Sequence, residues 1–513
     1  MRRLLLLAAA TALMPVQAGA QTAQSQPAAR QSLVDRVEQF SPQLDSIFEA
    51  FMGAPVPGLA YGVVADGRLA HVRTFGLRTV PGGAPVTPDT RFRIASMSKA
   101  FTALAILKLR DEGRLRLDDL AEQHVPELRN WRYPTTDSPR IRVRDLLAHS
   151  GGLVTDDPWG DRQQVLSEAD FTRMLRDGVP FTRAPQLSME YSNFGYALLG
   201  RIITNVSGRP YKDYIEQTIM RPLGMAATGY DISEGPAEMR AIGYRWENDA
   251  WAREPDMRHG TFGAMGGVQT TAQDYARWIA FLLSAWPARD GPETGPVRRS
   301  TVREMAQGLN FVAVARRPGQ TEGEPCQQAT AYGMGLRVAQ DCALGLTLAH
   351  GGGYPGYGSY MLLLPEHGVG LFALTNRTYS APVPAVWNAA MALHGAGLLE
   401  RTAVPVSASL DRAYRAAGAI YTAGNLDPGQ GLFAMNFLMD RSPENWARVL
   451  GEMRRQVGAC RTDAPIAPNG ALAGNFAWTC ERGRMEGRVL LAPTDPAGIQ
   501  ALNFRPIPNV PAQ

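Results

Sequence analysis

The stretch RFRIASMSKAFTALAILKL, residues 91–109, places Ser96 three residues before Lys99 at the start of an almost wholly apolar helix. Positions i and i+3 share one face of a helix, so the Ser96 hydroxyl and the Lys99 amine can approach each other. A serine hydroxyl is a weak nucleophile until a base takes its proton, and burial lowers the pKa of an amine toward the neutral form that can do so. The first helical turn also offers backbone N–H donors to an oxyanion. The stretch therefore predicts a serine nucleophile with a lysine base.

Chance is a poor explanation for this pair, because the chain has only three lysines against 49 arginines. Random placement would give roughly 0.1 Ser-x-x-Lys matches in the whole chain. The pair alone is moderate evidence, so its interpretation depends on partners elsewhere in the sequence.

Two further motifs carry groups that such a nucleophile needs. In EYSNFGYALLG, residues 190–200, Tyr191 can hold a proton between nucleophile and leaving group, and the Asn193 amide can bind a substrate carbonyl or amide. In LAHGGGYPGYG, residues 348–358, His350 ends a predicted strand and three glycines follow. Glycines let a ligand lie against a strand edge and leave backbone N–H groups for an oxyanion. Taken singly, a tyrosine at the end of a core helix and a plain glycine turn explain these segments equally well.

In order and separation, the motifs SMSK (96–99), YSN (191–193) and HGG (350–352) resemble those of the penicillin-recognising serine hydrolases. This group holds class C β-lactamases, D-alanyl-D-alanine carboxypeptidases, D-aminopeptidases and related esterases. The resemblance covers roughly residues 35–395 and leaves out the C-terminal part of the chain. Three other stretches also look similar to the group: LLAHSGGL at 146–153, RPLGMAATGY at 221–230 and GGVQTTAQDYARW at 266–278.

The resemblance implies a role for each motif residue. Ser96 is the acylated nucleophile, Lys99 its activating base or proton relay, and Tyr191 transfers a proton to the leaving group and activates water for deacylation. Asn193 holds the substrate, and the backbone N–H groups of Ser96 and Gly353 form the oxyanion hole. The reaction needs neither metal nor organic cofactor. The resemblance places the substrate beside the third motif: His350, Gly352 and Gly353.

The strand signals fit the fold that the resemblance implies, of the α/β (α+β) class and β-lactamase-like. A hairpin signal at Asp66-Gly67 and three β-rich runs between residues 344 and 376 lie near the two ends of the region. Helices and long loops fill residues 96–300. This pattern predicts one sheet built from distant parts of the chain. The resemblance implies that the sheet is antiparallel, is flanked by helices and is accompanied by a helical subdomain.

The chain divides into five segments. The first has two arginines, an apolar run from Leu4 to Met14 and the triplet Ala18-Gly19-Ala20, which is typical of a secretory signal peptide cleaved after Ala20. The segments that we predict are a signal peptide at 1–20, a flexible leader at 21–34, a serine hydrolase domain at 35–400, a linker at 401–409, and a small α+β domain of unknown role at 410–513. We therefore expect a periplasmic or secreted protein, by either the general or the twin-arginine export route.

Composition limits the partners. The formal net charge is +4, or about +2 without Arg2 and Arg3, and does not suggest nucleic acid. Beyond the signal peptide no apolar run is long enough to span a membrane, so we expect a small-molecule or peptide substrate and leave the oligomeric state open. In an exported protein the four cysteines suggest two local disulfides, the alternative being four reduced buried thiols. The expected pairs are Cys326 with Cys342 and Cys460 with Cys480.

One departure from the group bears on the substrate. Class C β-lactamases usually carry Lys-Thr-Gly where this chain has His350-Gly351-Gly352. A histidine is largely neutral at pH 7 and binds a carboxylate less strongly than a lysine does. We therefore expect a peptidase or amidase acting on peptides with D-residues, from cell walls or linearised cyclic peptides, with an esterase on small acyl esters and then a β-lactamase as alternatives. A sensor that binds penicillin or peptidoglycan fragments is the non-enzymatic alternative.

The remaining histidines give no sign of a metal site, because none has H-x-H or H-E-x-x-H spacing. His149, in LLAHSGGL, lies in one of the stretches that match the group at the end of a helix, and we predict no catalytic role for it.

Overall fold

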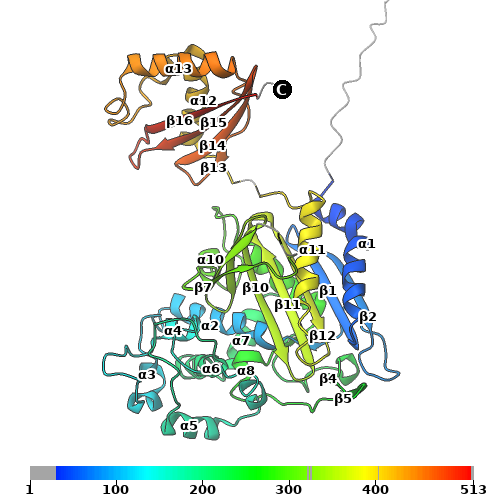
Figure 1. Ribbon diagram of the computed structural model, residues 1–513. Helices are drawn as coiled ribbons and strands as arrows, with labels where there is room; N and C mark the ends of the chain where they lie inside the picture. Colours follow the sequence, from blue (N-terminus) through cyan, green and yellow to red (C-terminus); the bar gives the residue numbers. More distant parts are fainter. Residues whose placement is uncertain (1–30, 321–322, 324–325, 403, 510–513) are drawn as a thin grey trace, which may run out of the picture.

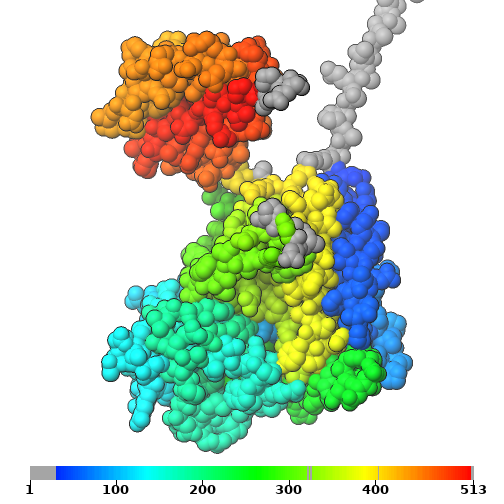
Figure 2. Space-filling view, viewed as in Figure 1, coloured from blue at the N-terminus to red at the C-terminus, as the bar shows by residue number. Residues whose placement is uncertain are grey.

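The computed structural model describes residues 31–320, 323, 326–402 and 404–509, and the predicted signal peptide at 1–20 lies outside them. The described residues form two bodies with separate hydrophobic cores (Figure 1). Figure 2 shows them as two masses that meet near the connecting segment. Helix α1 begins at Leu33 and α12 at Ala408, so the last two residues of the expected leader and of the expected linker are helical.

The larger body is built on an eight-stranded antiparallel sheet whose order is β2-β1-β12-β11-β10-β9-β8-β7. Residues far apart in the sequence pair in its middle, where Leu59 lies opposite Thr375. The strands are β1 (Gly58–Ala65), β2 (Arg68–Gly76), β7 (Asn310–Arg316), β8 (Gln327–Tyr332), β9 (Arg337–Asp341), β10 (Gly345–Tyr354), β11 (Tyr357–Leu364) and β12 (Val369–Thr375). The sheet built from both ends of the domain is confirmed, whereas β7, β8 and β9 were not predicted.

Helices cover both faces of this sheet, and a helical subdomain fills one side of the body (Figure 1). The helices are α1 (Leu33–Met52), α2 (Lys99–Asp111), α3 (Ala121–His124), α4 (Val143–Leu147), α5 (Glu168–Asp177), α6 (Asn193–Ser207), α7 (Tyr211–Ile215), α8 (Gly263–Gly266), α9 (Ala272–Leu283), α10 (Arg299–Met305) and α11 (Val383–Gly395). Two further small sheets have two strands each. One pairs β3 (Phe92–Arg93) with the distant β6 (Gln269–Thr270), and the other is the hairpin of β4 (Tyr244–Glu247) and β5 (Ala250–Arg253).

Strand β1 shows why the sheet is covered on both sides. Successive side chains of a strand point to opposite faces. Leu59 and Tyr61 join a core with α1 and α11, whereas Ala60 and Val64 join a second core that contains α2 and α9. Every residue of β1 is therefore buried, and the sheet separates two apolar layers. The layer that contains α2 also contains the buried residues around the Ser-x-x-Lys motif and holds that motif in place.

The smaller body is an α+β unit with its own core. It contains α12 (Ala408–Ala423), α13 (Pro443–Val457) and a sheet of β13 (Ala467–Pro468), β14 (Ala473–Cys480), β15 (Gly483–Leu491) and β16 (Ile499–Pro508). Trp478 is fully buried there, and its indole N–H donates to the Tyr414 hydroxyl at 2.8 Å. The two strands around Gly483 are confirmed, and β16 adds a strand that we did not predict.

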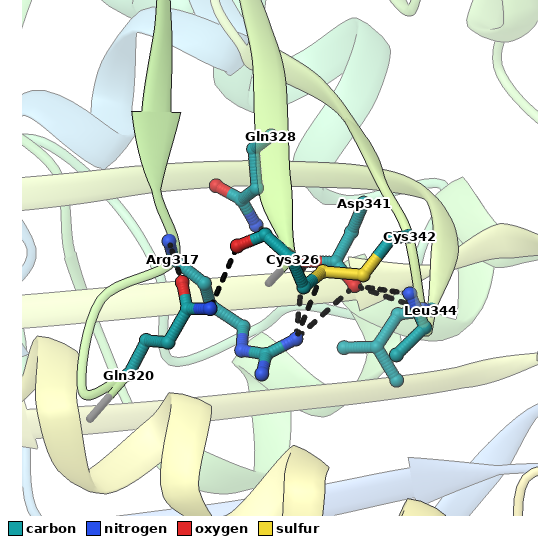
Figure 3. The surroundings of a disulfide bond; sticks show 8 residues. Arg317, Gln320, Cys326, Gln328, Asp341, Cys342 and Leu344 are labelled. Atoms are coloured by element: carbon teal, nitrogen blue, oxygen red, sulfur yellow. Dashed lines mark hydrogen bonds and ion pairs between the residues drawn. A yellow bond between two sulfur atoms is a disulfide. The ribbon is translucent and has the colours of Figure 1, made fainter. Parts of the chain in front are cut away.

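Both predicted disulfides are present, Cys326–Cys342 and Cys460–Cys480. Figure 3 shows the first, which links the chain just before β8 to the residue after β9. Beside it the buried Asp341 carboxylate accepts hydrogen bonds from the Arg317 guanidinium at 3.3 Å and from the Gln328 amide at 2.9 Å. Cys326, Asp341 and Cys342 are close enough together to hold a metal ion, but the two sulfur atoms are bonded to each other.

Candidate active site

Ser96 and Lys99 meet as the sequence predicts, although Ser96 lies before the long helix. Ser96 belongs to the four-residue 3-10 helix η1 (Ala95–Ser98), and α2 begins at Lys99. Lys99 Nζ lies 3.0 Å from Ser96 Oγ. Ala95 has a φ of 48°, in the left-handed region that strains a residue with a side chain. This strained turn leaves Ser96 8% exposed between more deeply buried neighbours.

The Lys99 amine is fully buried and lies within hydrogen-bonding distance of three oxygen atoms. Besides Ser96 Oγ these are Asn193 Oδ1, at 2.7 Å, and the Met265 carbonyl oxygen, at 3.0 Å. Burial lowers the pKa of Lys99 to about 8, against the opposing effect of nearby carboxylates, Asp157 first among them. A neutral amine has two N–H bonds and one lone pair. Because the oxygens of Asn193 and Met265 accept the two N–H bonds, the lone pair faces Ser96, which is the geometry of a base.

Asn193 holds this lysine. It is the first residue of α6, where the Asp156 carboxylate accepts hydrogen bonds from the backbone N–H groups of Asn193 and Phe194, at 2.7 and 2.9 Å. Its side chain is fully buried, with Oδ1 on Lys99 and Nδ2 donating to Asp157. The amide that we expected to bind the substrate is therefore bonded to protein at both ends in this structure.

Tyr191 lies at the same centre. Lys99 Nζ is 4.8 Å from the centroid of its ring. Burial raises the pKa of Tyr191 well above its usual value, Tyr332 adds to the rise, and the Ser96 side chain acts in the opposite direction. The phenol therefore keeps its proton at neutral pH and is suited to donate it.

The third motif lies within a strand, whereas we expected a strand to end at His350. β10 runs from Gly345 to Tyr354 and includes the three glycines. β9 pairs with it only from Gly345 to Ala349, while β11 covers the other edge. From His350 onward one edge of β10 has no partner strand among the described residues. Gly351 and Gly353 line the pocket that opens there.

His350 is buried and neutral. Its Nε2 lies 3.0 Å from the Tyr332 hydroxyl and its Nδ1 2.6 Å from the Gly351 carbonyl oxygen. Because a carbonyl only accepts, Nδ1 carries the proton and Nε2 accepts from Tyr332. Burial lowers the pKa of His350 to about 3, with Lys99 and Arg337 acting in the same direction. The ring borders the pocket, as expected for a residue beside the substrate, and it is neutral, as expected for a histidine. Protein groups engage both of its nitrogens, so in this structure neither is free to bind a substrate.

Gly352 allows the nucleophile's helix to lie against β10. A Cβ atom at this position would collide with the Ile94 carbonyl oxygen and with Ser359 Oγ. Ser359 Oγ donates to that same carbonyl at 2.8 Å, so β11 is bonded to the residue two before Ser96. The close approach at this glycine is made by the protein itself, where we had expected a ligand.

The site opens into a pocket of about 400 Å³ that has charges of both signs. Arg337, the first residue of β9, is exposed, and no ion pair holds it within the described part of the chain. The Asp161 carboxylate is buried and accepts a hydrogen bond from the Tyr379 hydroxyl at 2.9 Å. Burial raises the pKa of Asp161 to about 7. The lining residues are Ser96, Thr155, Asp157, Asp161, Tyr191, Arg337, His350, Gly351, Gly353 and Tyr379.

Sequence reasoning missed the charged residues of this pocket. The run Asp156-Asp157-Pro158-Trp159-Gly160-Asp161 gathers three carboxylates in six residues, which is the one local signal that was available. Arg337 has no such signal, because it is one of 49 arginines and its strand was not predicted.

Comparison with known proteins fits this geometry. A family model described as Beta-lactamase matches residues 44–396, more than half of the chain. The chain belongs to the beta-lactamase family. The predicted resemblance and fold class are confirmed. The smaller body lies outside this match.

Three proteins illustrate what the chain is similar to. Protein flp of Staphylococcus aureus (strain MRSA252) is 30% identical over 344 residues, which are 65% of this chain and 62% of flp, so the match spans about three fifths of that relative. D-alanyl-D-alanine-carboxypeptidase/endopeptidase AmpH of Escherichia coli (strain K12) is 27% identical over 64% of this chain and 81% of AmpH. The octameric penicillin-binding protein homologue from Pyrococcus abyssi has a TM-score of 0.56 and 21% identity, over 88% of this chain and 96% of its own.

Proposed function

We propose that this protein is an exported serine peptidase that cleaves peptides ending in a D-residue with a free carboxylate, through an ester on Ser96. The observation that carries the proposal is Arg337. It lines the same pocket as Ser96, is exposed, and has no ion-pair partner among the described residues. A guanidinium binds a carboxylate with two parallel hydrogen bonds, so a substrate whose carboxylate meets Arg337 is held beside the nucleophile.

The proposed acylation uses the residues of the site in turn. Lys99 Nζ takes the proton from Ser96 Oγ as that oxygen bonds to the carbonyl carbon, and the N–H groups of Ser96 and Gly353 receive the oxyanion. Tyr191 donates its proton to the leaving nitrogen as the C–N bond breaks, and Lys99 returns a proton to Tyr191. Water then attacks the ester carbonyl carbon, and Tyr191 passes its own proton to the neutral Lys99 as it takes one from the water. Lys99 gives that proton to Ser96 Oγ as the ester C–O bond breaks, which releases the shortened peptide and free Ser96.

Two further observations support the substrate and the location. The relative AmpH is named for action on D-alanyl-D-alanine, a peptide end with a free carboxylate. Two disulfides suit an oxidising compartment. No helix among the described residues is long and apolar enough to cross a membrane. Because disulfides persist in oxidising compartments, we propose a periplasmic or secreted enzyme.

The test compares a D-alanyl-D-alanine peptide with its C-terminal amide, in the wild type and in Arg337→Gln. A charge-assisted hydrogen bond contributes about 1.5–3 kcal/mol, so kcat/KM for the free acid should fall about 10- to 100-fold in the variant. The amide peptide and p-nitrophenyl acetate should be cleaved at wild-type rates. Arg316→Gln, an exposed arginine of β7 that does not line this pocket, is the matched control.

An equal preference for the free acid in wild type and Arg337→Gln would place the carboxylate elsewhere. A wild-type protein that cleaves only the ester would instead favour an esterase, and one that opens a β-lactam faster than it cleaves the peptide would favour a β-lactamase. A Ser96→Ala protein should be inactive on every substrate.

A further inference from the structure

His149 is placed where it can control Tyr191. It lies two residues beyond the end of α4, with a φ of 57°, and its side chain is 2% exposed. Its ring packs against the Tyr191 ring with 4.3 Å between the centroids. We infer that His149 is a positioning residue for Tyr191, holding the phenol in place for proton transfer through two hydrogen bonds to the residues on either side of it. The inference rests on the proposed function of Tyr191.

The two hydrogen bonds of His149 go to the residues directly before and directly after Tyr191. The Glu190 backbone N–H donates to the His149 carbonyl oxygen at 2.7 Å, and the Ser192 backbone N–H donates to His149 Nδ1 at 3.1 Å. Tyr191 itself precedes the first turn of α6, so no helical hydrogen bond fixes its backbone from the N-terminal side. One buried residue thus anchors both neighbours of the phenol and packs against its ring.

The bond to Ser192 also defines the form of the ring. Nδ1 must accept, so the proton of the neutral imidazole lies on Nε2, which has no hydrogen-bond partner in the structure. Burial holds the pKa of His149 well below its usual value, and Lys99, His350 and Arg337 act in the same direction. The other groups that face the ring are the tyrosines Tyr191, Tyr196 and Tyr332. His149 therefore stays in its neutral form near neutral pH and acts through Tyr191.

Substitutions of His149 that keep, move or remove the hydrogen-bond acceptor separate this role from simple packing. Asn carries an oxygen on Cγ, where His carries Nδ1, and it tolerates the left-handed backbone. His149→Asn can thus restore the acceptor for Ser192, whereas the amide oxygen of His149→Gln lies one bond farther out and His149→Ala has no acceptor. Asn310→Ala is the matched control. Asn310 donates at 2.7 Å to the carbonyl of Ala148, the residue before His149, and makes no hydrogen bond to Tyr191 in the described part of the chain.

The experiment measures kcat and KM for p-nitrophenyl acetate and for a D-alanyl-D-alanine peptide, and the rate at which a fluorophosphonate probe labels Ser96. We expect His149→Ala and His149→Gln to lower kcat about 10- to 100-fold, with KM and the labelling rate changed by less than about threefold. His149→Asn should recover most of the lost kcat, and Asn310→Ala should match the wild type.

The outcomes distinguish this inference from the proposed function. Unchanged kcat in His149→Ala, or equal losses in the Asn and Gln variants, would overturn the positioning role while leaving the Ser96 mechanism in place. A wild-type protein that cleaves the ester but not the peptide would refute the substrate class alone, and the ester series would still test His149. A wild-type protein that is neither labelled nor active would overturn both.

Discussion

The pH dependence of Ser96 reactivity should report the buried Lys99 amine, because only its neutral form can take the Ser96 proton. Because the pKa of Lys99 is lowered to about 8, the neutral fraction of Lys99 falls about tenfold for each pH unit below 8. The reactivity of Ser96 should fall with it. At pH 7 the neutral fraction is roughly 10%, against about 0.03% for a lysine at the usual value of 10.5. Burial of the Lys99 amine thus increases the neutral fraction at pH 7 about 300-fold.

The substitution Asp157→Asn tests the origin of this value. Asp157 is the foremost of the carboxylates that favour the charged form of Lys99. Asparagine keeps an oxygen for the hydrogen bond from Asn193 Nδ2 but removes the negative charge. The pKa of Lys99 should therefore fall further, and Ser96 should react a few-fold faster at pH 6.5 than in the wild type.

The assay is the rate of fluorophosphonate labelling, followed by intact mass between pH 5.5 and 9.5. We expect a rate that rises with pH to a plateau, with its midpoint near 8 in the wild type and lower in Asp157→Asn. Asp440→Asn, an exposed carboxylate of the smaller body, should leave the midpoint unchanged. A wild-type midpoint near 10, or a shift to higher pH in Asp157→Asn, would refute the assignment of Lys99 as the base.

Two further substitutions test the packing and the proton transfer at the site. Gly352→Ala should slow labelling of Ser96 by more than tenfold and lower the thermal unfolding midpoint, because the new Cβ collides with the Ile94 carbonyl oxygen. The control is Gly351→Ala, whose Cβ would lie at ordinary contact distance from the Tyr360 ring. It should behave as wild type in both measurements. Tyr191→Phe should slow cleavage of a D-alanyl-D-alanine peptide far more than acylation by p-nitrophenyl acetate, because a leaving amine needs the phenol's proton and nitrophenolate does not; equal losses in stopped-flow acylation rates would contradict the role of Tyr191 as the acid.

The features that the sequence predicted well depend on neighbouring residues. Ser96 and Lys99 are three positions apart, and the chain needs only a helical turn to bring their side chains together. The hairpin at Asp66-Gly67 has positive φ at both residues, as its sequence indicates. The disulfides join cysteines 16 and 20 residues apart. In each case the physical cause lies within one short segment.

Where the structure gives a residue another partner than the sequence led us to expect, the cause is a residue that is distant in the sequence but adjacent in the fold. Asn193 was expected to face the substrate, but its orientation depends on Lys99 and Asp157, which lie 94 and 36 residues away along the chain. His350 is turned inward by Tyr332, on a strand that was not predicted. β7 gave no signal because it is mostly exposed and does not alternate between buried and exposed residues. A motif fixes which groups are present, whereas the tertiary neighbours determine which of them remain free for a ligand.

The separation of His350 from Arg337 follows from the electrostatics around Lys99. A cation at the buried position of residue 350 would lie beside the base, and both positive charges would lose solvation. A neutral histidine avoids this and instead bonds Tyr332, while Arg337 lies at the exposed start of β9 and keeps its charge hydrated. The pocket thus has a hydrated cation without burying a second charge. The base proposed for Ser96 and the cation proposed to bind the substrate are consequently separate groups, so variants at one should leave the function of the other measurable.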